Sequence, residues 1–207
     1  MTSTTPDTRG GRVCPWWFVR SFDNPLRTLF QKPERILKPY VHPGDHCLDI
    51  GCGYGYFTVA MARLAGPTGA VTAADIQPEM LSGARRRLAK SGLSSRVTLR
   101  LLDSSGLALE ERFDFALAFW MLHEVPDQHT TFSQLRTVLR PGGRLLLAEP
   151  RMHVDEKAFQ KSVAIAEDAG FTKVETLSIA FSLGVVMVSN REDVAHQPGN
   201  KWTVDEH

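Results

Sequence analysis

A glycine-rich turn at the end of a short apolar strand constrains this chain more than any other feature. The strand-like segment His46–Ile50 runs directly into Gly51, Gly53 and Gly55, and a helix-like segment, Phe57–Leu64, follows. Glycines at a strand–helix junction let the backbone turn tightly and approach a ligand closely. The sequence therefore predicts a ligand site at the carboxyl ends of the strands of an α/β sheet.

Strand-like and helix-like segments alternate along the rest of the chain. The predicted strands are His46–Ile50, Ala70–Ala74, Val97–Leu102, Phe113–Phe119 and Arg144–Ala148, followed by two near 171–179 and 185–189. The predicted helices are Phe57–Leu64, Pro78–Lys90, Asp127–Leu139 and Asp155–Ala169. This alternation indicates a parallel sheet covered on both faces. The short link Ser182-Leu183-Gly184 predicts that the last two strands form an antiparallel hairpin.

The length of 207 residues fits one domain with short appendages. We expect residues 1–40 to form an N-terminal arm that is partly disordered, residues 41–190 to form the ligand-binding domain, and residues 191–207 to form a flexible tail. The arm carries Trp16-Trp17-Phe18, which either covers the site as a lid or anchors the arm. Short helices are predicted in it near 25–31 and 33–38.

The spacing of the glycines restricts the class of ligand that the loop can bind. A dinucleotide fingerprint, G-x-G-x-x-G, counted from Gly51 needs a small residue at position 56, where Tyr56 stands, and the third glycine comes one place early. Asp49 also precedes the loop, and a carboxylate there repels a pyrophosphate but attracts an ammonium group. The loop therefore favours a zwitterionic or cationic ligand.

Two more acids end the strands that follow. A carboxylate at Asp75 can accept hydrogen bonds from both hydroxyls of a ribose, and one at Asp103 can accept from an adenine amino group. Each residue taken singly also suits an ordinary turn or helix cap. Their register with the glycine loop favours the binding role.

These motifs, taken in order, resemble those of class I S-adenosylmethionine (SAM)-dependent methyltransferases. The resemblance spans roughly residues 46–190 and is carried by Asp49-x-Gly51-x-Gly53-x-Gly55, Asp75, Asp103, Phe113-Asp114 and Leu139-Arg140-Pro141-Gly142-Gly143. It implies a doubly wound, seven-stranded, mostly parallel sheet of Rossmann-like fold, with the last strand antiparallel. It also implies SAM as the cofactor, bound by Asp49, Gly51, Cys52, Gly53, Gly55, Asp75, Ile76, Met80, Asp103, Ser104 and Phe119.

Among subgroups, the chain looks most similar to small-molecule methyltransferases that act on quinones and metalloids. The segments GCGYGYF, ADIQPEML and LRPGGRLLLAEP carry that similarity. The chain departs from the metalloid enzymes because it lacks their cluster of cysteines. The resemblance thus implies a small-molecule substrate whose acceptor atom is open.

The acceptor is expected to meet the methyl group at the ends of the fourth and fifth strands. Three residues there, His123, Glu149 and His153, are candidate catalytic groups. His123 is a candidate base because the ordinary pKa of histidine is near neutrality, and the alternative is a histidine that bonds backbone. Glu149 orients a substrate amine or hydroxyl, or is a cap or ion-pair member. His153 has the same ambiguity as His123.

Composition excludes several classes of function. Lys and Arg number 24 and Asp and Glu 23, so we expect no broad nucleic-acid footprint. Three cysteines without a CxxC pair make a poor disulfide framework and no metal site. No apolar run is long enough to cross a bilayer and no signal peptide is visible, so we expect a cytoplasmic protein without a membrane partner, as a monomer or homodimer.

Four functions compete at this point. The leading hypothesis is a methyltransferase acting on a small molecule, and the alternative of another class is a catalytically silent SAM-binding regulatory protein. A nucleotide-linked oxidoreductase predicts NAD binding, which the position of Gly55 disfavours. An RNA or protein methyltransferase would favour a basic groove or a recognition domain, and neither is visible.

Overall fold

A seven-stranded sheet forms the centre of the molecule in the computed structural model, which describes residues 31–103, 106–107 and 109–190. The strands are β1 (His46–Ile50), β2 (Ala70–Asp75), β3 (Val97–Leu101), β4 (Phe113–Phe119), β5 (Leu139–Pro150), β6 (Phe171–Ile179) and β7 (Ser182–Ser189). The α-helices are α3 (Pro33–Leu37), α4 (Tyr56–Ala65), α5 (Pro78–Lys90), α6 (Gln128–Val138) and α7 (Glu156–Asp168). Short 3₁₀ turns lie at Ser94–Arg96 (η1) and Leu122–Glu124 (η2).

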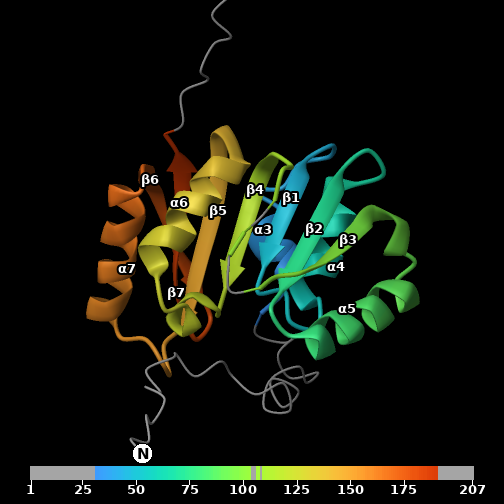
Figure 1. Ribbon diagram of the computed structural model, residues 1–207, viewed down its shortest axis with the longest axis horizontal. Coiled ribbons are helices and arrows are strands. Elements are labelled where there is room, and N and C mark those ends of the chain that lie inside the picture. Colours follow the sequence, from blue (N-terminus) through green and yellow to red (C-terminus); the bar gives the residue numbers. More distant parts are fainter. Residues whose placement is uncertain (1–30, 104–105, 108, 191–207) are drawn as a thin grey trace, which may run out of the picture.

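The strand order is β3-β2-β1-β4-β5-β7-β6 (Figure 1). Strands β1 to β5 pair in parallel, and β7 pairs antiparallel with both β5 and β6. The order reverses between β1 and β4, because the helix that follows β1, α4, covers one face of the sheet and the helix that follows β4, α6, covers the other. That switch point is where open α/β sheets bind ligands. The predicted fold, with its reversed last strand, is confirmed.

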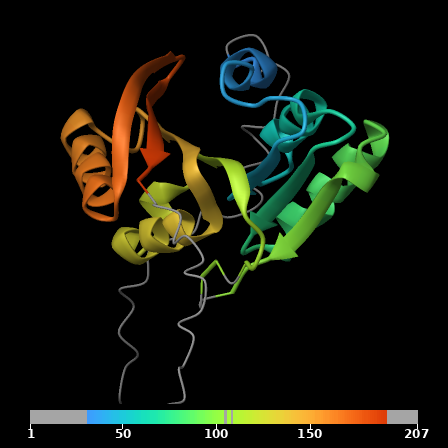
Figure 2. The ribbon, with the colours of Figure 1, turned by 90° about the horizontal axis from the view of Figure 1, so that it is seen from above.

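Helices cover both faces of the sheet, with α6 and α7 on one face and α3, α4 and α5 on the other (Figure 2). Successive residues of a strand point to opposite faces. Strand β4 follows this rule, since Ala116 and Ala118 pack with α6 and α7 while Phe115 and Leu117 pack with α3 and α4. Two apolar cores therefore hold the strand ends of β1 and β4 rigidly in place.

The hairpin at the end of the chain differs from the prediction. Residues 182–184 were expected to form its turn, but they begin β7, and Ala180-Phe181 form the turn instead. Ser182 and Leu183 are buried in the sheet, and Phe181 adopts a φ of 61° to close the turn. Burial of two side chains therefore outweighs the preference of Gly184 for a turn.

The junction between α6 and β5 also differs. The helix was expected to run to Leu139 and stop at Pro141-Gly142-Gly143, but it ends at Val138, and β5 begins at once. Leu139 is fully buried and pairs with Phe113 in an extended conformation. Sheet pairing thus replaces the last residue of the predicted helix.

The described end of the predicted N-terminal arm packs on the sheet domain. Leu37 of α3 is fully buried in the same core as α4. Gln31 is 1% exposed, and its side-chain amide donates to the Ala180 carbonyl at 3.0 Å. The division at residue 40 stays a prediction, and Trp16-Trp17-Phe18, Cys14 and the tail lie outside the described residues.

Within the described part of the chain, no helix has the length and apolar character needed to cross a membrane.

Candidate functional site

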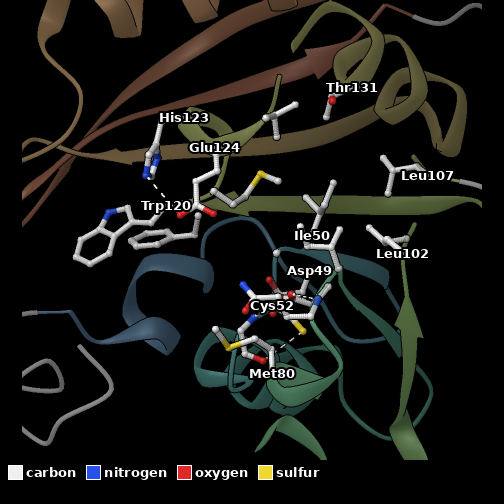
Figure 3. A pocket seen from close by; sticks show the side chains of 18 of the residues that line it. Asp49, Ile50, Cys52, Met80, Leu102, Leu107, Trp120, His123, Glu124 and Thr131 are labelled. Carbon is white, nitrogen blue, oxygen red and sulfur yellow. Dashed lines mark hydrogen bonds and ion pairs between the residues drawn. The ribbon is translucent and has the colours of Figure 1, made fainter. Parts of the chain in front are cut away.

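A cavity of about 730 Å³ opens at the carboxyl ends of β1, β2 and β4. Figure 3 shows Asp49, Cys52 and Met80 on one side of it, and Trp120 and His123 on the other. Among the predicted cofactor residues, those that line the cavity are Asp49, Gly51, Cys52, Gly53, Asp75, Ile76, Met80, Asp103 and Phe119. The strand topology therefore brings together residues spread over 71 positions, from 49 to 119.

The glycine loop is held by the second strand. The amides of Gly51 and Cys52 both donate to the Ala74 carbonyl of β2, at 2.8 and 3.0 Å. Gly51 and Gly53 have φ values of 70° and 52°, which favour glycine strongly. A Cβ on Gly53 would meet no atom within 4 Å, whereas a Cβ on Gly51 would meet Cβ of Met121 at 2.7 Å. Gly53 therefore leaves room for a ligand, and Gly51 leaves room for the protein itself.

Asp75 joins the loop to the end of β2. One carboxylate oxygen accepts from the Gly53 amide at 2.9 Å and the other accepts from the Gln77 amide at 2.9 Å. Burial raises the pKa of Asp75, and these backbone hydrogen bonds oppose that rise. The carboxylate is 7% exposed and faces the cavity. Each oxygen has a further lone pair with which to accept from a ligand hydroxyl.

Asp49 is a buried carboxylate at the base of the cavity. It is 2% exposed and accepts a hydrogen bond from the hydroxyl of Thr58 in α4. Burial raises its pKa to about 7; the Thr58 hydrogen bond lowers that pKa and the charge of Asp75 raises it. A cationic group brought into the cavity would favour the ionised form of Asp49.

Two predicted cofactor residues differ from the rest of the set. Gly55 does not line the cavity; it precedes α4 with a φ of 75°, and a Cβ there would meet Cβ of Ala84 in α5 at 3.2 Å. The third glycine therefore serves helix packing. Ser104 lies outside the described residues.

His123 and Glu149 form a hydrogen-bonded pair between η2 and β5. Nδ1 of His123 lies 2.5 Å from one oxygen of Glu149, and the other oxygen accepts from the Leu122 amide at 2.8 Å. Glu149 is 1% exposed and lies behind His123, which itself lines the cavity. With Nδ1–H donating to the carboxylate, neutral His123 keeps its lone pair on Nε2.

The pKa of His123 reflects opposing effects. Burial lowers this pKa. The hydrogen bond to Glu149 and the charges of Glu149 and Glu124 together raise it by more, so the pKa lies above its ordinary value. Nε2 lies 3.9 Å from Glu124. The arrangement is that of a histidine held by a carboxylate, able to accept a proton and to be stabilised once charged.

His153 also lines the cavity, with its ring centroid 5.5 Å from that of His123 in an edge-on arrangement. All three predicted catalytic residues therefore come together. His123 bonds a side-chain carboxylate through Nδ1, and the carboxylate does not itself reach the cavity.

An aromatic wall was missing from the predicted site. The cavity is also lined by Tyr56, Phe57, Phe119 and Trp120, of which Phe119 was predicted as a cofactor residue and Trp120 was expected at the acceptor end without a role of its own. The sequence shows these residues as two adjacent pairs, one after the glycine loop and one at the end of β4. Aromatic pairs that follow two strands expected to be neighbours in the sheet are the sequence signal for such a wall, because the carboxyl ends of neighbouring strands meet at one site.

The far end of the cavity is lined mainly by aliphatic side chains with a few polar groups. Leu102, Leu107 and Thr131 lie together there in Figure 3, next to Asp103. The side-chain carbonyl of Gln134 accepts from the Leu107 amide at 3.0 Å and so holds this loop against α6. Asp103 itself is exposed and bridges to Gly106.

A doubly wound sheet with a reversed final strand, a glycine turn and acids at successive strand ends defines the class I methyltransferase fold. Solved structures agree, including a SAM-dependent methyltransferase from Aquifex aeolicus with a TM-score of 0.77 and 23% identity, covering 85% of this chain and 99% of that one. A family model described as a methyltransferase domain matches residues 41–191. The chain therefore belongs to this family of SAM-dependent methyltransferases.

Two curated relatives are similar to part of the chain. A demethylmenaquinone methyltransferase from Symbiobacterium thermophilum is 35% identical over 117 residues, 56% of this chain and 47% of the relative. A ubiquinone biosynthesis O-methyltransferase from Xanthomonas axonopodis pv. citri is 33% identical over 136 residues, 64% of this chain and 55% of the relative. The chain thus spans about half the length of these relatives.

Proposed function

We propose that this chain transfers a methyl group from SAM to a small molecule that must lose a proton, with His123 as the base. The observation that carries the proposal is the His123–Glu149 pair on the cavity wall, across the cavity from Asp49 (Figure 3). A silent SAM-binding protein would require only the cofactor-binding residues, whereas a histidine paired with a buried carboxylate is an arrangement that proton transfer uses.

The donor set of the cavity fits SAM. Asp75 is a carboxylate for ribose hydroxyls, and Asp49 is a buried anion suited to an ammonium group. Gly53 offers the open space that a closely approaching ligand requires, and Met80 and Ile76 supply apolar contacts for a nucleoside. Asp103 lies at the end where an adenine amino group would be accepted.

When bound, SAM supplies a methyl group on a positively charged sulfur. The chain has to align the acceptor with that methyl at about 3–3.5 Å between reacting atoms. Nε2 of His123 accepts the acceptor's proton as the new bond to the methyl carbon forms and the carbon–sulfur bond breaks. Glu149 holds the ring and stabilises the resulting imidazolium. Glu149 is therefore a positioning residue, and His123 is the catalytic one.

The acceptor we propose is a hydroxylated aromatic compound related to quinones. One curated relative is named as a demethylmenaquinone methyltransferase and the other as a ubiquinone biosynthesis O-methyltransferase. A ring hydroxyl is a proton donor that His123 can serve, whether the methyl goes to oxygen or to an adjacent ring carbon. The aromatic wall beside His123 suits the ring. We further propose that the arm up to residue 40 contributes to covering the cavity.

Calorimetric titration with SAM, followed by detection of S-adenosylhomocysteine over a panel of hydroxyaromatics, amines and thiols, tests the proposal. We expect SAM binding and turnover with hydroxyaromatics. His123→Ala should keep SAM affinity and lose about 10²–10⁴-fold in turnover. His129→Ala, an exposed histidine of α6 outside the cavity, is the matched control and should behave as wild type. SAM binding without turnover on any compound would favour the silent protein instead.

A further inference from the structure

Four side chains on one side of the cavity form what we call the aromatic shelf: Tyr56, Phe57, Phe119 and Trp120. The ring centroids of Phe57 and Phe119 are 4.2 Å apart, with an angle of 32° between the ring planes. Those of Phe119 and Trp120 are 5.5 Å apart, with an angle of 33° between the planes. Tyr56 meets Phe57 edge-on at 5.6 Å. Phe57 and Phe119 are largely buried, whereas Tyr56 and Trp120 are half-buried, so the shelf presents mainly the rings of Tyr56 and Trp120, each packed against one of the two buried rings.

Trp120 is held in an orientation that costs backbone strain. Its φ is 61°, in the left-handed region that a bulky residue rarely adopts. Its amide donates to the Ala148 carbonyl at 2.7 Å, and its indole N–H donates to the hydroxyl of Ser182 at 2.9 Å. Ser182 is 2% exposed in β7. A strained residue fixed by two hydrogen bonds at a cavity wall indicates a functional constraint.

The polar atoms of the shelf are directed into the protein. The hydroxyl of Tyr56 donates to the Gln31 carbonyl at 2.7 Å, as the indole N–H of Trp120 donates to Ser182. Because the donors of both rings are engaged with buried partners, the rings present carbon to the cavity. Such a surface recognises another flat ring by stacking, and it offers little to a saturated or strongly polar acceptor.

The catalytic histidine lies at the edge of this shelf. His123 and Trp120 both line the cavity, and Figure 3 shows them on the same side of it, across from Met80 and Cys52. A ring lying on Trp120 therefore brings a substituent at its rim toward His123. The relative placement of the two residues sets which substituent that is.

We propose that the aromatic shelf binds the flat ring of the acceptor, and that the Trp120–Ser182 hydrogen bond is a specificity device that sets the angle at which the ring faces His123. This inference rests on the proposed function and names the residues that select its substrate class. Trp120 contacts the acceptor, and Ser182 acts through Trp120 as a positioning residue.

Calorimetry with 2-naphthol and its saturated analogue 2-decalol, in the presence of S-adenosylhomocysteine, tests the shelf without requiring turnover. We expect wild-type protein to bind 2-naphthol at least tenfold tighter than 2-decalol. Trp120→Leu should abolish that preference while S-adenosylhomocysteine affinity stays within twofold, which also shows that the variant is folded. Equal affinity of the wild type for both compounds would overturn the proposal.

Two conservative variants separate stacking from orientation. Trp120→Phe and Ser182→Ala keep an aromatic ring on the shelf but remove the hydrogen bond, so both should bind 2-naphthol within threefold of wild type. With the best hydroxyaromatic acceptor, both should lower kcat at least tenfold with little change in KM. Ser178→Ala, an exposed serine of β6, is the control for Ser182→Ala. An unchanged kcat in both variants would refute the orienting role.

The outcomes also distinguish this inference from the proposed function. Absence of S-adenosylhomocysteine binding would refute the function itself. Normal cofactor binding and turnover with no preference for a flat ring would refute only the shelf.

Discussion

His123 and Glu149 are 26 positions apart in the chain, yet their side chains form a hydrogen bond directly behind the cavity wall. The pair exists because η2 follows β4 and Glu149 lies near the end of the adjacent strand β5. Glu149 also fixes the turn through the Leu122 amide. One buried carboxylate therefore sets both the position and the protonation of the histidine.

The pH dependence of turnover should report this pair. His123 has to be neutral to accept a proton, and its pKa is raised above the ordinary 6.5, so we expect kcat to rise with pH through a midpoint above 6.5. Glu149→Gln removes the charge that raises the pKa and leaves the burial that lowers it. The charge of Glu124 still raises that pKa, so the midpoint should move to lower pH than in the wild type, with a lower plateau. Steady-state kinetics from pH 5 to 9 measures both.

A midpoint that stays in place in Glu149→Gln would show that another group titrates. His153→Gln is the companion variant, since His153 lines the same cavity and is also near His123. If the midpoint follows that residue instead, His153 is the base.

In the glycine turn between β1 and α4, Gly51 and Gly53 are required for different reasons, although the sequence alone does not distinguish them. Gly51 and Gly53 both have positive φ. Only Gly51 lies against another side chain, that of Met121, which belongs to the turn after β4. Gly51 therefore holds two strand ends close together, while Gly53 keeps the cavity open.

Alanine at each position should have distinct effects. Gly53→Ala adds only backbone strain, so we expect a loss of about 1 kcal/mol in the free energy of unfolding, with at least a tenfold loss of SAM affinity. Gly51→Ala adds a contact at 2.7 Å and should cost about 3 kcal/mol. Urea unfolding and calorimetry measure the two quantities. Equal stability losses would contradict the assigned roles.

The type and order of the described elements were largely predictable, because hydrophobic periodicity and glycine or proline breaks are local. Pro78–Lys90 and Phe113–Phe119 have the predicted bounds. The errors, at β7 and at the end of α6, arise where burial in the sheet overrides a local turn signal. Sequence spacing placed the acids at the cavity, but it gave no basis for the Glu149 contact, the packing role of Gly55 or the Trp120 orientation, all of which depend on tertiary neighbours.

The cavity joins strand ends from both halves of the sheet. Residues that follow β1, β2 and β3 line the cavity together with residues that follow β4 and β5. A ligand that contacts both halves therefore cross-links the sheet at its switch point. Ligand binding should be visible as global stabilisation.

Thermal unfolding should show this coupling. At a SAM concentration one hundred times Kd, the folded state gains about 2.7 kcal/mol, which raises Tm by roughly 5–10 °C for a chain of this size. Asp75→Ala removes the carboxylate that holds Gly53 and should eliminate the shift. Differential scanning calorimetry with and without SAM measures it, and an identical shift in Asp75→Ala would contradict the assigned role.

Gln31 ties the start of the described chain to Tyr56 and to the β6–β7 turn, both at the cavity, whereas β7 carries the chain to Asn190 at the opposite edge of the sheet. These two described positions are therefore unequal for protein engineering. A bulky label attached at Gln31 would lie beside Tyr56 and the cavity. A label attached at Asn190 would lie beyond the end of β7 at the far edge of the sheet, so immobilisation through that residue would leave the cavity accessible.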